Sequence, residues 1–163
     1  MTLFRTFPLA RSLALILALG STLLAGCSSV RSELGLATKA ELNIQVADNV
    51  NPDDQGHASP IVLDVLVLKN RRQFEQEDFL SLYRDAAGQL GDDLINKVQL
   101  KEFIPGEKRT ETLKLDDKAR YIGILAEYSR YDKAVTKLLL PIEPHSTNDF
   151  DIEVGHLGLH SKE

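Results

Sequence analysis

Two short apolar runs constrain the fold of this chain most strongly. Residues 61–68 read IVLDVLVL and residues 121–128 read YIGILAEY, each with one acidic residue. Eight residues rich in β-branched side chains suit a strand, and apolar side chains on both faces require cover on both sides. Because a second sheet packed face to face provides that cover, we expect two sheets with these runs as central strands.

The remaining strands are indicated by alternation. Leu42, Ile44 and Val46 alternate with polar neighbours, and so do Phe150, Ile152 and Val154, which predicts two half-buried strands. Further strands are expected around Val98 and Leu100, around Leu113 and Leu115, and over residues 135–142. Seven or eight short strands with turn signals roughly every ten residues are typical of an all-β, two-sheet β-sandwich.

One stretch changes to helical periodicity. Apolar side chains recur at i, i+3, i+4 and i+7 from Phe79, and the acidic residues Glu77 and Asp78 suit a helix N-terminus. The pattern predicts a short helix over about residues 76–86 that ends near Gly88, in a sandwich with one or two short inserted helices. Residues 94–95 are expected in a second short turn or an irregular packing segment.

The first 26 residues have the features of a secretory signal. Arg5 and Arg11 supply positive charge, and the apolar run over residues 12–24 is shorter than the about 20 residues that span a bilayer. Residues 24–27 read LAGC, which resembles the lipobox of bacterial lipoproteins. Cys27 is the only cysteine, so a disulfide within one molecule is impossible. We expect cleavage before Cys27 and acylation of its thiol and amine.

The chain is therefore expected to have three parts. Residues 1–26 form the signal peptide, residues 27–38 the lipidated cysteine and a tether, and residues 39–163 the β-sandwich domain. More than one acyl chain anchors a protein stably without a transmembrane helix. Ser28 stands where, by resemblance to enterobacterial sorting, an aspartate favours the inner membrane. The expected location is the periplasmic face of the outer membrane.

Charge and motifs exclude several functions. With 24 acidic and 19 basic residues and no basic stripe, the chain is a poor candidate for nucleic-acid binding. It contains no G-x-S-x-G, no H-E-x-x-H and no glycine-rich phosphate loop, and lipid consumes its only thiol. We expect no enzymatic activity, no cofactor, no metal and no small-molecule substrate.

An ordered set of motifs resembles a known family. The set comprises Asn51-Pro52, Gly56, Ser59-Pro60, Leu68-Lys69, Phe74, Asp78-Phe79, Leu82-Tyr83, Pro105-Gly106-Glu107 and Tyr121-Ile122-Gly123. With the lipobox in front, it is similar to the TssJ family, the outer-membrane lipoproteins of the type VI secretion system. The resemblance spans nearly the whole mature chain. It departs at Leu66, where an aromatic residue is expected, and in the absence of tryptophan.

The resemblance implies both a fold and a role. The fold is a transthyretin-like β-sandwich with added helical elements, and the role is an outer-membrane anchor for a trans-envelope complex built with TssM and TssL. In that family the loop between the first two strands contacts the periplasmic C-terminal region of TssM. Carried over to this chain, the contact residues are Asp48, Asn49, Val50, Asn51, Pro52, Asp53, Asp54, Gln55, Gly56, His57, Ala58 and Ser59.

Other functions remain open for the same loop. Without the family, residues 48–59 are a solvated connection. Asp48, Asp53 and Asp54 leave calcium as competing chemistry, although the spacing of an EF-hand is absent. The alternative function is thus a periplasmic small-ligand- or calcium-binding lipoprotein on a similar sandwich.

Four further residues carry chemistry that could matter elsewhere. Asp64 and Glu127 are acids within apolar strands and would be the starting point of a lipid-anchored enzyme. A position at a sheet margin, or a Lys or Arg partner, explains each more simply. His156 and His160 have the four-residue spacing of a helical zinc pair, but glycines lie among them, so we expect a solvated C-terminal tail.

Overall fold

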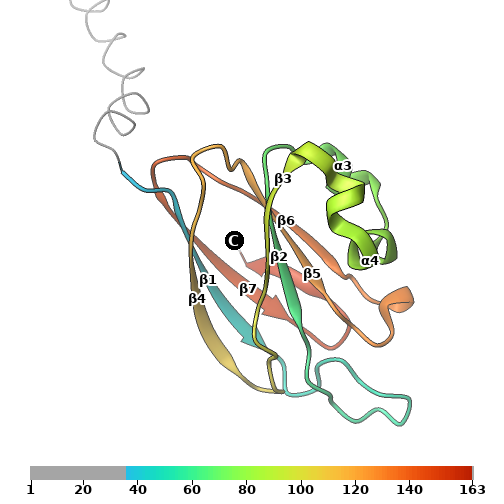
Figure 1. The fold of residues 1–163 in the computed structure, drawn as a ribbon. Coiled ribbons are helices and arrows are strands. Elements are labelled where there is room, and N and C mark those ends of the chain that lie inside the picture. The colour runs from blue at the N-terminus through green and yellow to red at the C-terminus, as the bar shows by residue number, and fades with distance from the viewer. Residues whose placement is uncertain (1–35, 163) are drawn as a thin grey trace, which may run out of the picture. The chain divides into compact units, whose positions relative to one another are not determined.

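Eight strands form two four-stranded sheets in the computed structural model, which describes residues 36–162 (Figure 1). The strands are β1 (Lys39–Val46), β2 (Leu63–Leu68), β3 (Leu94–Gln99), β4 (Lys108–Lys114), β5 (Tyr121–Ala126), β6 (Lys137–Pro141), β7 (Thr147–Val154) and β8 (Leu159–Lys162). One sheet has the order β4-β1-β7-β8 and the other β3-β2-β5-β6. The expected signal peptide and Cys27 lie outside the described residues.

Alternation along β1 and β7 orients the first sheet. Ala40, Leu42, Ile44 and Val46 of β1 are buried, whereas their neighbours point outward. Strand β1 pairs antiparallel with β4 and parallel with β7, and the parallel register places Ile44 beside Ile152. Because both strands bury every second residue, the sheet has one apolar and one polar face. The two strands predicted from alternation are confirmed.

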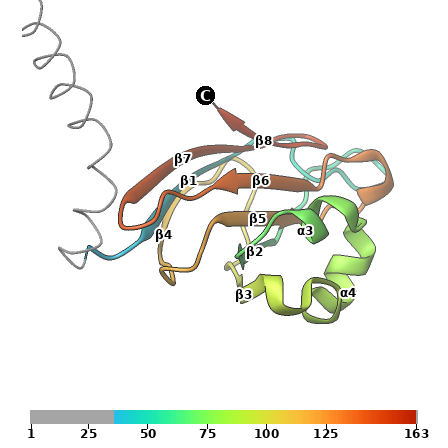
Figure 2. The same ribbon diagram turned by 90° about the horizontal axis from the view of Figure 1, so that it is seen from above.

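The central strands of the second sheet, β2 and β5, are buried on both faces, as predicted. All six residues of β2 are buried. Leu63, Val65 and Val67 belong to the core between the sheets, while Leu66 and Leu68 join a second apolar cluster on the outer face. Helices α3 (Arg72–Gln76) and α4 (Phe79–Leu90) cover that outer face (Figure 2).

The prediction of one helix over residues 76–86 is wrong in its bounds. Glu77 is extended, with φ −75° and ψ 144°, and separates α3 from α4. Asp78 caps α4 by accepting a hydrogen bond from Ser81 N at 3.0 Å, so the acidic pair marks the start of the second helix only. With its cap at Asp78 and the buried faces of Leu82, Ala86 and Leu90, α4 continues past Gly88.

The end of α4 also differs from the prediction. The helix is kinked at Asp85 and ends at Leu90, before Gly91, whose φ of 51° favours glycine. Residues 94–95 begin strand β3 instead of forming a turn.

The prediction of a solvated C-terminal tail is wrong as well. Residues 159–162 form β8, which pairs antiparallel with β7. Gly155 N donates to Gly158 O at 2.7 Å, so the two glycines that argue against a helix close a hairpin instead. Within residues 36–162, no helix combines the length and apolar character needed to cross a membrane.

Candidate functional site

The β1–β2 loop, residues 48–59, follows the C-terminal end of β1, at the opposite end of the strand from Lys39 (Figure 1). The chain enters β1 at Lys39 and leaves it at Val46. Eight residues at about 3.3 Å each separate the two ends by roughly 25 Å. Lys39 and the loop with the expected contacts are therefore at opposite ends of β1.

Asn51 holds the base of the loop. Its side chain is only 4% exposed, and its backbone has a φ of 45°. Asn51 Nδ2 donates to Pro60 O at 2.8 Å, and Asn51 Oδ1 accepts from Ser129 N at 2.8 Å. One side chain thus ties the start of the loop to its end and to the segment that follows β5.

The β7–β8 turn supports the loop from the other side. Asn51 N donates to His156 O at 3.1 Å, and His156 Nδ1 lies 2.8 Å from Asn49 O. Within the loop, Ser59 N donates to Val50 O at 3.1 Å, and the Val50 side chain is fully buried in the core between the sheets. His156 is consequently a structural contact of the loop.

Asp53 organises the tip. Its Oδ1 accepts from Gln55 N and from His57 N, both at 2.8 Å, and its Oδ2 lies 3.3 Å from His57 Nδ1. The hydrogen bond from the His57 backbone is the main cause that lowers the pKa of Asp53. Gly56 completes the turn with a φ of 85°. Asp53 therefore stabilises the conformation of the loop. Asp48 and Asp54 are the exposed acidic residues of the loop.

The twelve predicted contact residues divide by exposure. The exposed ones are Asp48, Asn49, Asp54, Gln55, Gly56 and His57; the half-buried ones are Asp53, Ala58 and Ser59; the buried ones are Val50, Asn51 and Pro52. The arrangement presents an acidic, internally bonded protrusion. Across residues 36–162, no group of three or more His, Cys, Asp or Glu side chains is arranged to hold a metal ion.

The two acids in apolar strands have different surroundings. Asp64 is 1% exposed, and its Oδ2 lies 2.6 Å from Lys97 Nζ, which confirms a lysine partner. Glu127 is half-buried and accepts a hydrogen bond from Gln99 Nε2 at 3.4 Å. Desolvation, and then the nearby charge of Asp64, raise the pKa of Glu127.

Three stacked aromatic side chains form a patch that was not predicted from the sequence. The Phe79 ring stacks with the Tyr83 ring, with centroids 5.7 Å apart, and with the Tyr131 ring at 5.6 Å. Phe79 and Tyr83 follow helical spacing, which indicates only a helix face. Tyr131 comes from a separate turn, and no local sequence signal connects it with α4.

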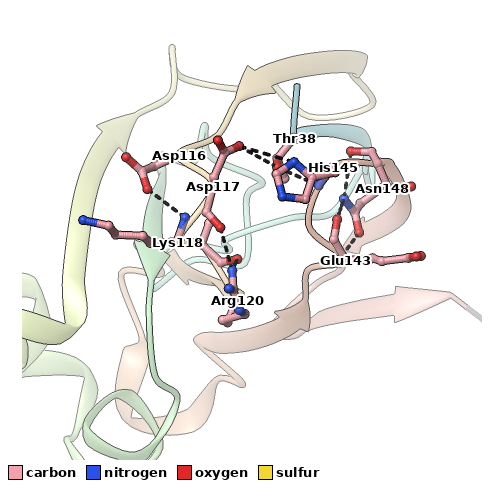
Figure 3. Close-up of polar contacts among 10 residues, drawn as sticks. Thr38, Asp116, Asp117, Lys118, Arg120, Glu143, His145 and Asn148 are labelled. Carbon is pink, nitrogen blue, oxygen red and sulfur yellow. Dashed lines mark hydrogen bonds and ion pairs between the residues drawn. The ribbon is translucent and has the colours of Figure 1, made fainter. Parts of the chain in front are cut away.

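The end of the sandwich at which β1 begins is held together by polar contacts (Figure 3). Thr38, at the end of the expected tether, is fully buried. Its Oγ1 donates to Asp117 Oδ1 at 3.3 Å and accepts from His145 N at 2.9 Å. Asn148 Nδ2 donates to Lys39 O at 3.0 Å. These bonds fix the position at which the chain enters β1.

The family model described as type VI secretion lipoprotein (VasD, EvfM, TssJ) matches residues 38–157. The chain belongs to the TssJ family. The match begins at the buried Thr38, includes the β1–β2 loop and ends within the β7–β8 turn, after His156. No curated protein matches the chain significantly.

Solved structures agree with the TssJ assignment. The type VI lipoprotein TssJ1 of Pseudomonas aeruginosa is 28% identical, with a TM-score of 0.73, over 78% of this chain and 98% of that one. Serratia marcescens Lip, a membrane-bound component of the type VI secretion system, is 26% identical, with a TM-score of 0.71, over 77% and 98%. A chain of a type VI membrane complex shares the fold at 23% identity and a TM-score of 0.69, over 78% and 99%. The predicted two-sheet β-sandwich is confirmed.

Proposed function

We propose that this TssJ-family lipoprotein is a structural outer-membrane anchor of the type VI secretion trans-envelope complex and has no catalytic role. In this proposal residues 1–26 are removed, Cys27 is acylated, residues 27–38 are the tether, and the sandwich from residue 39 binds the periplasmic C-terminal region of TssM. The contact is the β1–β2 loop.

The observation that carries the proposal is the internal order of that loop, which follows the end of β1 opposite Lys39. The two half-buried hydrogen bonds of Asn51 and the three contacts that Asp53 makes with the loop tip restrict the conformations of the loop before any partner arrives. A preordered loop loses less conformational entropy on binding than a slack one.

Charge gives the loop a preference for basic partners. Asp48 and Asp54 are exposed, and neither forms an ion pair within 4.0 Å in the described part of the chain. Such exposed acids speed encounter with a basic surface more than they add affinity.

Two solved structures with chains that share this fold are consistent with such an assembly. One is a type VI membrane complex at 23% identity, and the other carries the name of the C-terminal domain of the type VI protein TssM from EAEC, at 22% identity and a TM-score of 0.65.

The loop is tested by removing its tip and measuring binding to the periplasmic C-terminal region of TssM. Because Asp53 N donates to His57 O at 2.9 Å, deleting residues 54–56 joins two residues that already lie close together. We expect the deletion to abolish binding and leave thermal unfolding nearly unchanged, since the buried anchors Val50 and Asn51 remain. A folded deletion variant that binds TssM like the parent contradicts the proposal.

Charge reversal gives a milder test with a matched control. Asp54→Lys should slow association and reduce its salt dependence, whereas Asp149→Lys on the exposed face of β7 should leave both unchanged. Equal effects of the two variants would show that association depends on net charge and not on the position of Asp54 in the loop.

Anchoring is tested by Cys27→Ser. The variant should fold but no longer float with outer membranes, because acyl chains hold the protein there. Continued flotation would refute acylation at Cys27 as the anchor.

A further inference from the structure

A hollow of about 250 Å³ opens on the outer side of the second sheet, beside the aromatic patch. Phe79, Tyr83 and Tyr131 line it together with Glu127 and Ser129. The side chains of Tyr83 and Tyr131 are 47% and 40% exposed, and both stack on Phe79. Three stacked aromatic rings on a surface mark a contact site more often than scattered apolar residues do.

Charge decides what kind of group fits this hollow. Among the residues that line it, Glu127 is the one with an ionisable carboxyl group, and the nearby Lys97 is already paired with the buried Asp64 at 2.6 Å. In the part of the chain that the structure describes, Glu127 forms no ion pair within 4.0 Å; its polar contact is the 3.4 Å hydrogen bond from Gln99. An apolar occupant would remove water from this carboxylate without giving it a partner, which is unfavourable.

We propose that the hollow is a docking site for an arginine side chain of a protein partner. The planar guanidinium group stacks on aromatic rings and at the same time donates hydrogen bonds to a carboxylate. Tyr83 and Tyr131 supply exposed rings, and Glu127 supplies the carboxylate. A lysine ammonium is a compact, strongly hydrated charge that gains less from stacking.

This site borders the β1–β2 loop but does not depend on it. Ser129, which lines the hollow, donates its backbone N–H to Asn51 Oδ1 at 2.8 Å. A partner that covers the loop could therefore also reach the hollow. The arginine site can nevertheless be tested without TssM, so its failure and the failure of the proposed function are distinguishable.

The test titrates the mature chain carrying Cys27→Ser with acetyl-Gly-Arg-Gly-amide and follows the tyrosine ring signals by NMR. We expect saturable shifts of the Tyr83 and Tyr131 signals, with a Kd on the order of 1–10 mM for a single side chain. The peptide with citrulline, which has the same shape without the charge, should bind at least about tenfold more weakly.

Variants separate a docked arginine from general attraction to an acidic protein. Glu127→Gln should weaken arginine binding about tenfold, and Tyr83→Leu should weaken it several-fold. Glu41→Gln, on the other sheet, is the matched control and should change nothing.

Four results would overturn the proposal. The first two are the absence of a saturable NMR shift with the arginine peptide and equal shifts with the citrulline or a leucine peptide. The third is an equal loss of arginine affinity in Glu41→Gln and Glu127→Gln. The fourth is a shift of the tyrosine ring signals that depends on protein concentration alone. The last result would assign the patch to a second copy of this chain.

Discussion

Replacing Asn51 by alanine should destabilise the domain and disorder the β1–β2 loop together. The substitution removes the hydrogen bonds to Pro60 O and from Ser129 N, both 2.8 Å long. It also places an alanine at a φ of 45°, a left-handed conformation that asparagine tolerates better than most residues.

The magnitude follows from these two contributions. Each half-buried hydrogen bond stabilises the fold by about 1 kcal/mol net. Alanine in the left-handed region adds roughly 1 kcal/mol relative to a residue that accepts it. The free energy of unfolding should therefore fall by about 2–3 kcal/mol, which lowers the Tm of a domain of this size by roughly 10 °C.

Urea denaturation and thermal unfolding measure this loss of stability. The variant Asn51→Gly separates the contribution of the hydrogen bonds from that of the backbone conformation. Glycine removes both side-chain hydrogen bonds but accepts the positive φ, so it should be about 1 kcal/mol more stable than the alanine variant. If the alanine variant lost less than about 1 kcal/mol, or if glycine and alanine were equal, the role assigned to Asn51 would be refuted.

Three further changes test the second sheet. Gly123→Ala should lower the free energy of unfolding by about 1–3 kcal/mol in urea denaturation, because the new Cβ would lie 2.5 Å from the Phe74 ring. Lys97→Met should lower the free energy of unfolding by about 3–5 kcal/mol, since Asp64 would remain buried without its cation. Adding Asp64→Leu should restore most of this stability. A double variant as unstable as the single one would argue against the Asp64–Lys97 ion pair. Burial raises the pKa of Glu127, so the parent loses stability as pH rises through that raised pKa. Glu127→Gln should thus unfold at a higher temperature than the parent near neutral pH, with the advantage disappearing below the usual carboxyl range; a pH-independent difference would contradict this.

Much of the fold was predictable because its signals are local. A strand that buries one face must alternate, as β1 and β7 do, and a strand that buries both must be apolar throughout, as β2 is. Asp64 is the one polar residue of β2, and it is tolerated there because Lys97 of the neighbouring strand β3 pairs with its carboxylate.

What was not predictable depends on distant contacts. Strand β8 has four residues, LHSK, without alternation, and exists because β7 offers it a free edge. The division of the helical region rests on whether Asp78 or an earlier residue provides the cap. The sequence places Asn51 in a turn, but nothing local indicates its bond to Ser129, 78 residues away.

The pairing of β1 with β7 and the support of the loop by the β7–β8 turn have a consequence for biosynthesis. The chain emerges N-terminus first, so the β1–β2 loop is made long before His156, whose carbonyl accepts a hydrogen bond from Asn51 N. Loop closure over about 100 residues is slow and comes late in folding. The ordered form of the loop is thus one of the last features to form, and a nascent or truncated molecule that lacks residues 155–162 should not present it.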